Sequence, residues 1–171
     1  MRKITIVLAL ILLLSACTPA APTTSPSTTA APTQPSTAPS STQTTAPALL
    51  PISFLLYMPD EGWESFVTEE MTLETLEPER IVQALIEKRV LADDVMVNQV
   101  TVSGSGLALD MNEAFLMQVY TMGTTGERML IGCLINTFLS AYDCEYVMLT
   151  ADGKIINSGH AEYSEPLYPF A

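Results

Sequence analysis

The C-terminal stretch GHAEYSEPLYPFA contains the residue types that a hydrolase uses. It holds His160, the only histidine of the chain, together with Ser164 and the carboxylates of Glu162 and Glu165. A nucleophilic triad needs a base within hydrogen-bond reach of the serine hydroxyl. In an extended segment His160 and Ser164 would lie about 13 Å apart, since each residue advances the chain by about 3.3 Å. The chain also lacks the Gly-x-Ser-x-Gly pattern. We therefore expect no catalytic residue here, and a structural His160 whose imidazole bonds a neighbouring backbone group or carboxylate.

The rest of the chain contains few residues of the types that bind metals or sugars. A zinc site draws on several His and Cys ligands, and the chain has one histidine and three cysteines. A calcium loop needs regularly spaced Asp residues, whereas Asp152-Gly153 is typical of a hairpin turn. We therefore expect no metal and no cofactor. Trp63 and Tyr57, near the first predicted turn, are candidate contacts to a partner or a glycan, but the favoured interpretation of Trp63 is that it covers an edge of the core.

The N-terminus has the pattern of an export signal. Arg2 and Lys3 precede an apolar run over residues 4–14, which is shorter than the roughly 20 residues that span a bilayer. The string LSAC, which ends at Cys17, resembles the lipobox of bacterial lipoproteins and implies cleavage before Cys17 and acylation of that residue. The alternative is a secreted protein with a chance cysteine. Residues 1–17 are thus predicted to be a lipoprotein signal peptide, with attachment to the extracytoplasmic face of a bacterial cell membrane through lipid on Cys17.

Residues 18–49 differ in composition from the rest of the chain. Up to Ala48 they are Ser, Thr, Ala and Pro with two Gln, without charge or large apolar side chains. Such a segment cannot bury enough apolar surface to offset the entropy of ordering, and we expect a disordered tether. Beyond Cys17 the chain carries 19 acidic and 5 basic residues, hence a formal net charge of −14. This charge argues against nucleic acid as a partner.

Residues 50–171 carry the patterns of one folded domain. Strands are predicted over 52–58 and 64–73, then a helix that begins at Pro78 and continues to about Val90. A hairpin follows over 95–111, although Asn98-Gln99 disturbs its alternation. Asp110 or Asn112 could then cap a short helical turn. This first half predicts two antiparallel hairpins separated by one helix.

A long helix is predicted over residues 125–142. Its apolar residues form two adjacent strips, so it is either central to the core or shared with a partner. Strands over 146–150 and 154–156 complete the chain. Cys133 within this helix and Cys144 beyond it would be about 12–13 Å apart, too far for a disulfide, and we expect two buried thiols. The order of elements predicts an α+β fold in which two main helices pack on one face of a mostly antiparallel sheet.

These elements and several short strings resemble the GerMN family of sporulation and spore-germination domains. The strings are YMPD, LALDMN, LINTF, DG and GHAEYSEPL, and they cover about residues 52–167 in a single copy. The resemblance implies a fold similar to ring-building modules of secretion-like assemblies, an extracytoplasmic, membrane-attached protein, and no established catalytic residues. The family-motif positions, which it implies are structural, are Asp110, Asn136, Gly153, Gly159, His160, Ser164, Glu165 and Pro166.

The function expected from the sequence is a lipid-anchored, non-enzymatic assembly or interaction module in sporulation or germination. Its partner would be another envelope protein or a second copy of itself. The alternative is a cell-wall glycan binder that uses Trp63. A hydrolase that depends on His160 is a third hypothesis, against which the residue spacing argues.

Overall fold

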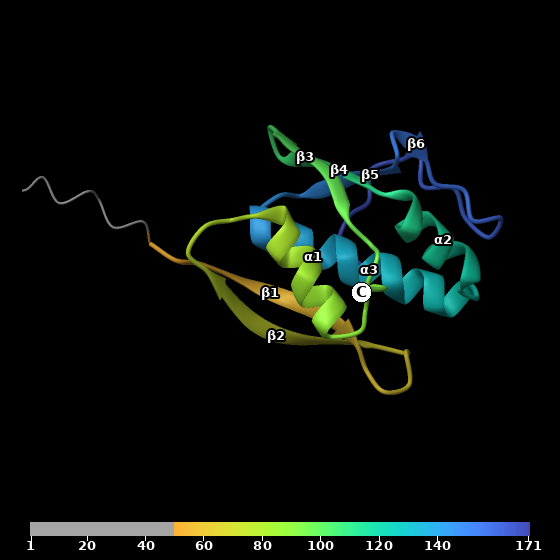
Figure 1. Cartoon of the computed structure of the whole chain (residues 1–171), viewed down its shortest axis with the longest axis horizontal. Coiled ribbons are helices and arrows are strands. Elements are labelled where there is room, and N and C mark those ends of the chain that lie inside the picture. The colour runs from red at the N-terminus through yellow and green to blue at the C-terminus, as the bar shows by residue number, and fades with distance from the viewer. Residues whose placement is uncertain (1–49) are drawn as a thin grey trace, which may run out of the picture. The chain divides into compact units, whose positions relative to one another are not determined.

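Six strands and three helices make up residues 50–171, the part of the chain that the computed structural model describes (Figure 1). The predicted signal peptide, Cys17 and the predicted tether lie outside these residues. Within them, the positions of the predicted strands and of the long helix are confirmed. None of the described helices is both long and apolar enough to cross a membrane.

The first two strands form a separate two-stranded sheet. Strand β1 (Ile52–Pro59) and strand β2 (Phe66–Leu73) pair antiparallel in a continuous register from Ile52↔Leu73 to Pro59↔Phe66. Asp60 organises the turn, because its carboxylate accepts hydrogen bonds from the backbone N–H of Glu64 at 2.9 Å and the hydroxyl of Ser65 at 2.6 Å. The Ser65 bond, and then the Glu64 bond, lower the pKa of Asp60.

The other four strands form a mixed sheet in the order β3-β4-β5-β6. Strands β3 (Val97–Ser103) and β4 (Gly106–Met111) form the predicted hairpin, and β5 (Tyr146–Ala151) and β6 (Lys154–Ile155) form another. Strands β4 and β5 run parallel. Three of the four strand pairs are antiparallel, so the prediction of mostly antiparallel pairing is confirmed. The prediction of one sheet was wrong, because there are two sheets, and the larger one is mixed. The physical reason is the helical connection from β4 to β5, since a crossover through helices returns the chain in the same direction.

Three helices, rather than two main ones, connect the strands. Helix α1 (Pro78–Glu87) begins at the predicted proline, and helix α2 (Glu113–Thr121) is capped by Asn112, whose side chain accepts from the Phe115 N–H at 3.3 Å. Helix α2 is longer than the predicted single turn. Helix α3 (Thr124–Tyr142) buries 13 of its 19 residues. Figure 1 shows α3 between the β1–β2 hairpin and the four-stranded sheet. Of the two alternatives predicted for this helix, a central place in the core is the one that is found.

The two cysteines of the domain are free thiols. Cys133 is buried within α3, and burial raises its pKa to about 12. Cys144 lies beyond the helix and is half-buried. The prediction of two thiols instead of a disulfide is confirmed, because α3 extends through Cys133 to Tyr142. The expected burial is found for Cys133 but was wrong for Cys144, which lies beyond the end of the helix.

Candidate functional site

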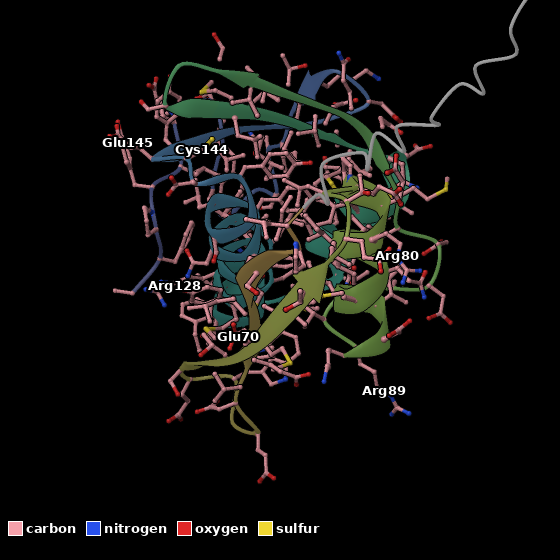
Figure 2. The ribbon with its side chains drawn as sticks, turned by 90° about the vertical axis from the view of Figure 1, so that its left-hand side faces the viewer. Glu70, Arg80, Arg89, Arg128, Cys144 and Glu145 are labelled. Atoms are coloured by element: carbon pink, nitrogen blue, oxygen red, sulfur yellow. The ribbon has the colours of Figure 1, made fainter. Side chains whose placement is uncertain are left out.

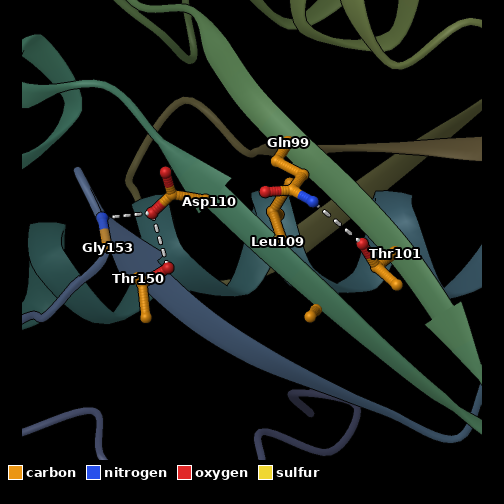
Figure 3. Close-up of a pocket in the computed structure, with 7 residues that line it drawn as sticks. Gln99, Thr101, Leu109, Asp110, Thr150 and Gly153 are labelled. Atoms are coloured by element: carbon orange, nitrogen blue, oxygen red, sulfur yellow. Dashed lines mark hydrogen bonds between the residues drawn. The ribbon is translucent and has the colours of Figure 1, made fainter.

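Asp110 is the centre of a hydrogen-bond network at the end of β4. Its Oδ1 accepts from the Thr150 hydroxyl at 2.6 Å and the Gly153 N–H at 2.8 Å, as Figure 3 shows. Its Oδ2 accepts from the Asn98 side chain at 3.1 Å. Burial raises the pKa of Asp110, but the three hydrogen bonds outweigh it and the net pKa is lowered. The structure thus brings together the family-motif positions Asp110 and Gly153, and their bonds tie β4 to the β5–β6 turn.

Asn98 belongs to this network and was missed as a site residue. It lies where the β3–β4 register shifts between Val97 and Gln99. Its Nδ2 lies 2.9 Å from the carbonyl of Met111 and 2.9 Å from Oδ1 of Asp152, besides its contact with Asp110. The broken alternation at Asn98-Gln99 was the available signal, because a bulge re-aims a side chain.

The open face of the mixed sheet is hollowed beside Asp110. The hollow has a volume of about 370 Å³ and is lined by residues from three strands and one turn: Gln99, Thr101, Ala108, Leu109, Asp110, Thr150 and Gly153 (Figure 3). Further along this face, Tyr146 and Tyr168 have ring centroids 5.9 Å apart, and Tyr168 is 60% exposed. The lining combines the apolar Ala108 and Leu109 with polar side chains, and its one carboxylate, Asp110, already accepts hydrogen bonds within the fold. Such a surface suits a neutral polar ligand better than bond-breaking chemistry.

His160 lies on an exposed turn and not in an extended strand. The Ser158 N–H donates to the Ala161 carbonyl at 3.0 Å, and Gly159 has a φ of +84°, which glycine adopts without strain. Within the described residues the His160 imidazole makes no hydrogen bond; only its backbone N–H does, to the Ser158 hydroxyl at 3.1 Å. The expected imidazole hydrogen bond was therefore wrong, and so was the extended conformation around His160. Within residues 50–171 no hydrogen bond joins the side chains of His160 and Ser164, and the Glu165 carboxylate accepts none.

The buried carboxylate of this region is Glu127, which sequence patterns did not single out. It lies in the first turn of α3 and is 2% exposed. Its Oε1 accepts from the hydroxyls of Ser158 at 2.6 Å and Tyr163 at 2.7 Å, whereas its buried Oε2 has no hydrogen-bond partner in the described part of the chain. Burial first, and the bond to Glu127 second, raise the pKa of Tyr163. An acid in the first turn of a helix is common, so nothing in the sequence distinguished Glu127.

Asn136 fastens the C-terminal segment (residues 156–171) to α3. Its Nδ2 donates to the Phe170 carbonyl at 2.9 Å, and its Oδ1 accepts from the Phe170 N–H at 2.8 Å. One residue after Pro166, Leu167 pairs with Val147 of β5 through two backbone hydrogen bonds of 2.9 and 2.8 Å. The C-terminal segment therefore extends the sheet, but it pairs after Pro166 and does not end there.

Tyr57 and Trp63, the two candidate contact residues, differ in whether they pack on the core. Tyr57 is half-buried, packs on the core and meets Phe66 edge-to-face, with ring centroids 6.4 Å apart. Trp63 is half-buried in the β1–β2 turn, has a φ of +57° and is not among the side chains packed against the core. The expected core contact of Trp63 is thus not found.

Residues 50–171 contain no group of three or more His, Cys, Asp or Glu side chains placed to hold a metal ion. The polar side chains that are brought together, at Asp110, Glu127 and Asn136, bond groups of the fold itself. These side chains therefore stabilise the domain.

A comparison with family models matches residues 55–157 to Germane, described as "Sporulation and spore germination". Among solved structures, a Clostridium perfringens protein described as a candidate lipoprotein is 16% identical; the match covers 69% of this chain and 87% of that one, with a TM-score of 0.43. The tandem GerMN domains of the sporulation protein GerM from Bacillus subtilis are 15% identical, with 70% of this chain and 45% of that one covered and a TM-score of 0.48. A comparison with curated proteins gave no match.

Proposed function

Because the chain belongs to the Germane family of sporulation and spore germination, we propose that it is a lipid-anchored interaction module outside the bacterial cell membrane. In this role Cys17 carries the lipid, residues 18–49 act as the tether, and residues 50–171 bind an envelope protein or a second copy. The LSAC string supports the anchor, and the composition of residues 18–49 supports the tether. The domain binds and positions; it does not catalyse.

One observation carries this proposal: polar side chains at the family-motif positions Asp110 and Asn136 bond other parts of the domain and hold the fold together. Asp110 joins β4 to the β5–β6 turn, and Asn136 bonds both backbone groups of Phe170. A catalytic base needs free access to a substrate proton, whereas these groups already have partners inside the domain. His160 is accessible, but no acid or hydroxyl is bonded to its imidazole among the described residues; only its backbone N–H is bonded, to the Ser158 hydroxyl.

Two measurements test the proposal in a Gram-positive host. The unmodified chain should be found in the membrane fraction and enter the detergent phase on phase separation. The Cys17→Ser variant should be released into the medium. In-cell crosslinking of the anchored chain should then capture an envelope protein or a second copy. Capture of the monomer alone, or retention of Cys17→Ser in the membrane, would overturn the proposal.

A cell-wall glycan binder is a second candidate, and one observation favours it. The Tyr146–Tyr168 pair stands on the open sheet face beyond the uncharged polar side chains of the hollow, and aromatic faces beside hydrogen-bonding groups suit sugars. Retention on purified peptidoglycan tests it. Loss of retention with Tyr168→Ala would place binding on the sheet face, loss with Trp63→Ala would place it on the β1–β2 turn, and no retention of the unmodified chain would reject this function.

A further inference from the structure

We propose that the outer edge of β2 is a docking strand that accepts an extended, basic segment of a partner protein as an added strand. The inference rests on the proposed function as an interaction module, and it names the surface and the partner class. The β2 edge is defined here as the outward backbone groups of Phe66, Thr68, Glu70 and Thr72.

The register and the contacts of β1 identify these groups. The N–H groups of Leu55 and Tyr57 donate to Ser140 Oγ and Thr137 Oγ1 of α3, both at 2.9 Å, so they point away from β2. Their register partners are Glu70 and Thr68. In an antiparallel pair the residues of such non-hydrogen-bonded positions both direct their backbone groups outward. The N–H and C=O groups of the β2 edge therefore face away from β1, and no backbone or side-chain partner is recorded for them among the described residues.

The other strand edges of the domain are less suited to pairing. The outer edge of β1 is occupied by the two α3 hydroxyls. The outer strand β3 is interrupted by its bulge, and β6 has only two residues. The β2 edge is the longest uninterrupted one, over eight residues. Figure 1 shows β2 at the margin of the domain, on the far side of β1 from α3.

The charge around this edge specifies the occupant. Acidic residues lie along the hairpin and directly after it: Asp60, Glu61, Glu64, Glu69, Glu70, Glu74 and Glu77. Within residues 50–171 their only ion pair is that of Glu69 with Lys88, at 2.5 Å. Figure 2 shows Glu70 to the left of Arg80 and Arg89 and on the same side of the view as Arg128. A second copy that paired through β2 would place glutamates beside glutamates, which is destabilising. The charges thus protect the edge from self-pairing and favour a strand rich in Lys or Arg.

The chemistry of recognition follows from strand addition. Main-chain hydrogen bonds to Thr68 and Glu70 would supply affinity without regard to sequence, and the carboxylates would select basic side chains on alternate positions. Because β1 is held by α3, the edge is already in the extended conformation that the incoming strand needs, so little ordering entropy opposes binding.

The binding test uses an end-capped peptide of about eight residues in which Val and Thr alternate with Lys, long enough to pair along one strand. A matched peptide carries Glu in place of Lys. The full chain is compared with Thr68→Pro, which removes an outward N–H but no hydrogen bond of the domain, and with Thr68→Val, which keeps that N–H. Glu70→Lys tests the charge, and Glu113→Lys on α2 makes the same charge change at a distant exposed site.

We expect the Lys peptide, and not the Glu peptide, to bind with an affinity that falls as salt rises. Thr68→Pro should weaken binding about tenfold or more, as the loss of one or two backbone hydrogen bonds predicts, with an unchanged melting temperature. Glu70→Lys should also weaken it, whereas Thr68→Val and Glu113→Lys should not. Amide exchange should slow at Thr68 and Glu70 when the peptide binds.

Failure of the Lys peptide to bind, equal binding by Thr68→Pro, or unchanged exchange at Thr68 would overturn the inference. In-cell crosslinking separates this failure from failure of the proposed function. A neighbour captured equally by the unmodified chain and by Thr68→Pro would leave the interaction role standing and reject the β2 edge. No neighbour for either chain would reject the role itself.

Discussion

Gly132→Ala in the middle of α3 should destabilise the domain, although alanine is the better helix former. A Cβ at position 132 would lie 2.4 Å from Cζ and 2.9 Å from Cε1 of Phe66, and 3.2 Å from Cβ of Phe170. Phe66 belongs to β2 and Phe170 to the C-terminal segment. Gly132 is therefore the point at which the hairpin and the end of the C-terminal segment both approach α3, and only a missing side chain allows it.

The size of the effect follows from two opposing contributions. Alanine in a helix interior is favoured over glycine by about 1 kcal/mol. Overpacking a filled site costs about 1–3 kcal/mol, because a ring must leave its rotamer or the backbone must shift. We expect the second contribution to prevail, with a net loss of up to about 2 kcal/mol and a melting temperature lower by roughly 4 °C per kcal/mol.

Chemical denaturation followed by circular dichroism measures this change, and Gly126→Ala in the same helix is the matched control. The atoms nearest to a Cβ at position 126 would belong to Met122, with Sδ at 3.2 Å and Cβ at 3.6 Å, and a thioether can move. Gly126→Ala should therefore stabilise the domain by about 0.5–1 kcal/mol. Phe66→Leu should recover part of the loss in Gly132→Ala. If Gly132→Ala stabilised the domain as much as Gly126→Ala does, the proposed close approach of Phe66 to α3 would be refuted.

Four further predictions concern single side chains. Asp110→Asn should lower the free energy of unfolding at neutral pH by about 1 kcal/mol. Because the folded domain lowers the pKa of Asp110, this difference should persist at every pH above 3.8, the ordinary pKa of aspartate, and disappear as the pH falls through the lowered pKa. Denaturation at several pH values measures it. Asn136→Ala should lower the free energy of unfolding by about 1–3 kcal/mol, because the N–H and C=O of Phe170 lose their hydrogen-bond partner. Carboxypeptidase should also digest the C-terminus of this variant faster. Cys133 should resist a thiol reagent until the domain unfolds, given its burial and raised pKa. His160→Ala should change stability by less than about 0.5 kcal/mol in thermal melts, because its exposed imidazole bonds nothing described.

Local patterns were enough to locate the elements but not to arrange them. Alternation and helical spacing depend on neighbouring residues, so β1, the β3–β4 hairpin and α3 were predictable close to their bounds. The division into two sheets depends on where β1 turns its free edge. That edge docks on Thr137 and Ser140, which in the sequence only interrupt an apolar helix. A hydroxyl on a helix gives no sign of the strand that it will bond.

The candidate site was predictable where a residue has a local role and missed where its partner is distant. Gly153 belongs to a turn that the dipeptide Asp152-Gly153 predicts, but its hydrogen bond joins it to Asp110, 43 positions away in the sequence. Asn98 left a trace as a break in alternation, whereas Glu127 left none, because its partners Ser158 and Tyr163 come from the end of the chain. His160 drew attention through its residue type alone, and residue type says nothing about exposure.

The few polar residues of α3 determine which surfaces of this domain are free to bind. Thr137 and Ser140 occupy the edge of β1, and Asn136 holds the C-terminal segment. Both attachments satisfy backbone groups, of β1 and of the C-terminal segment, that would otherwise be open to pairing with another chain. Once α3 has satisfied them, the long backbone edge that stays open is that of β2, and it is the edge surrounded by carboxylates. The central helix thus leaves one strand available and makes it rigid, which is the arrangement that a binding module on a tether requires.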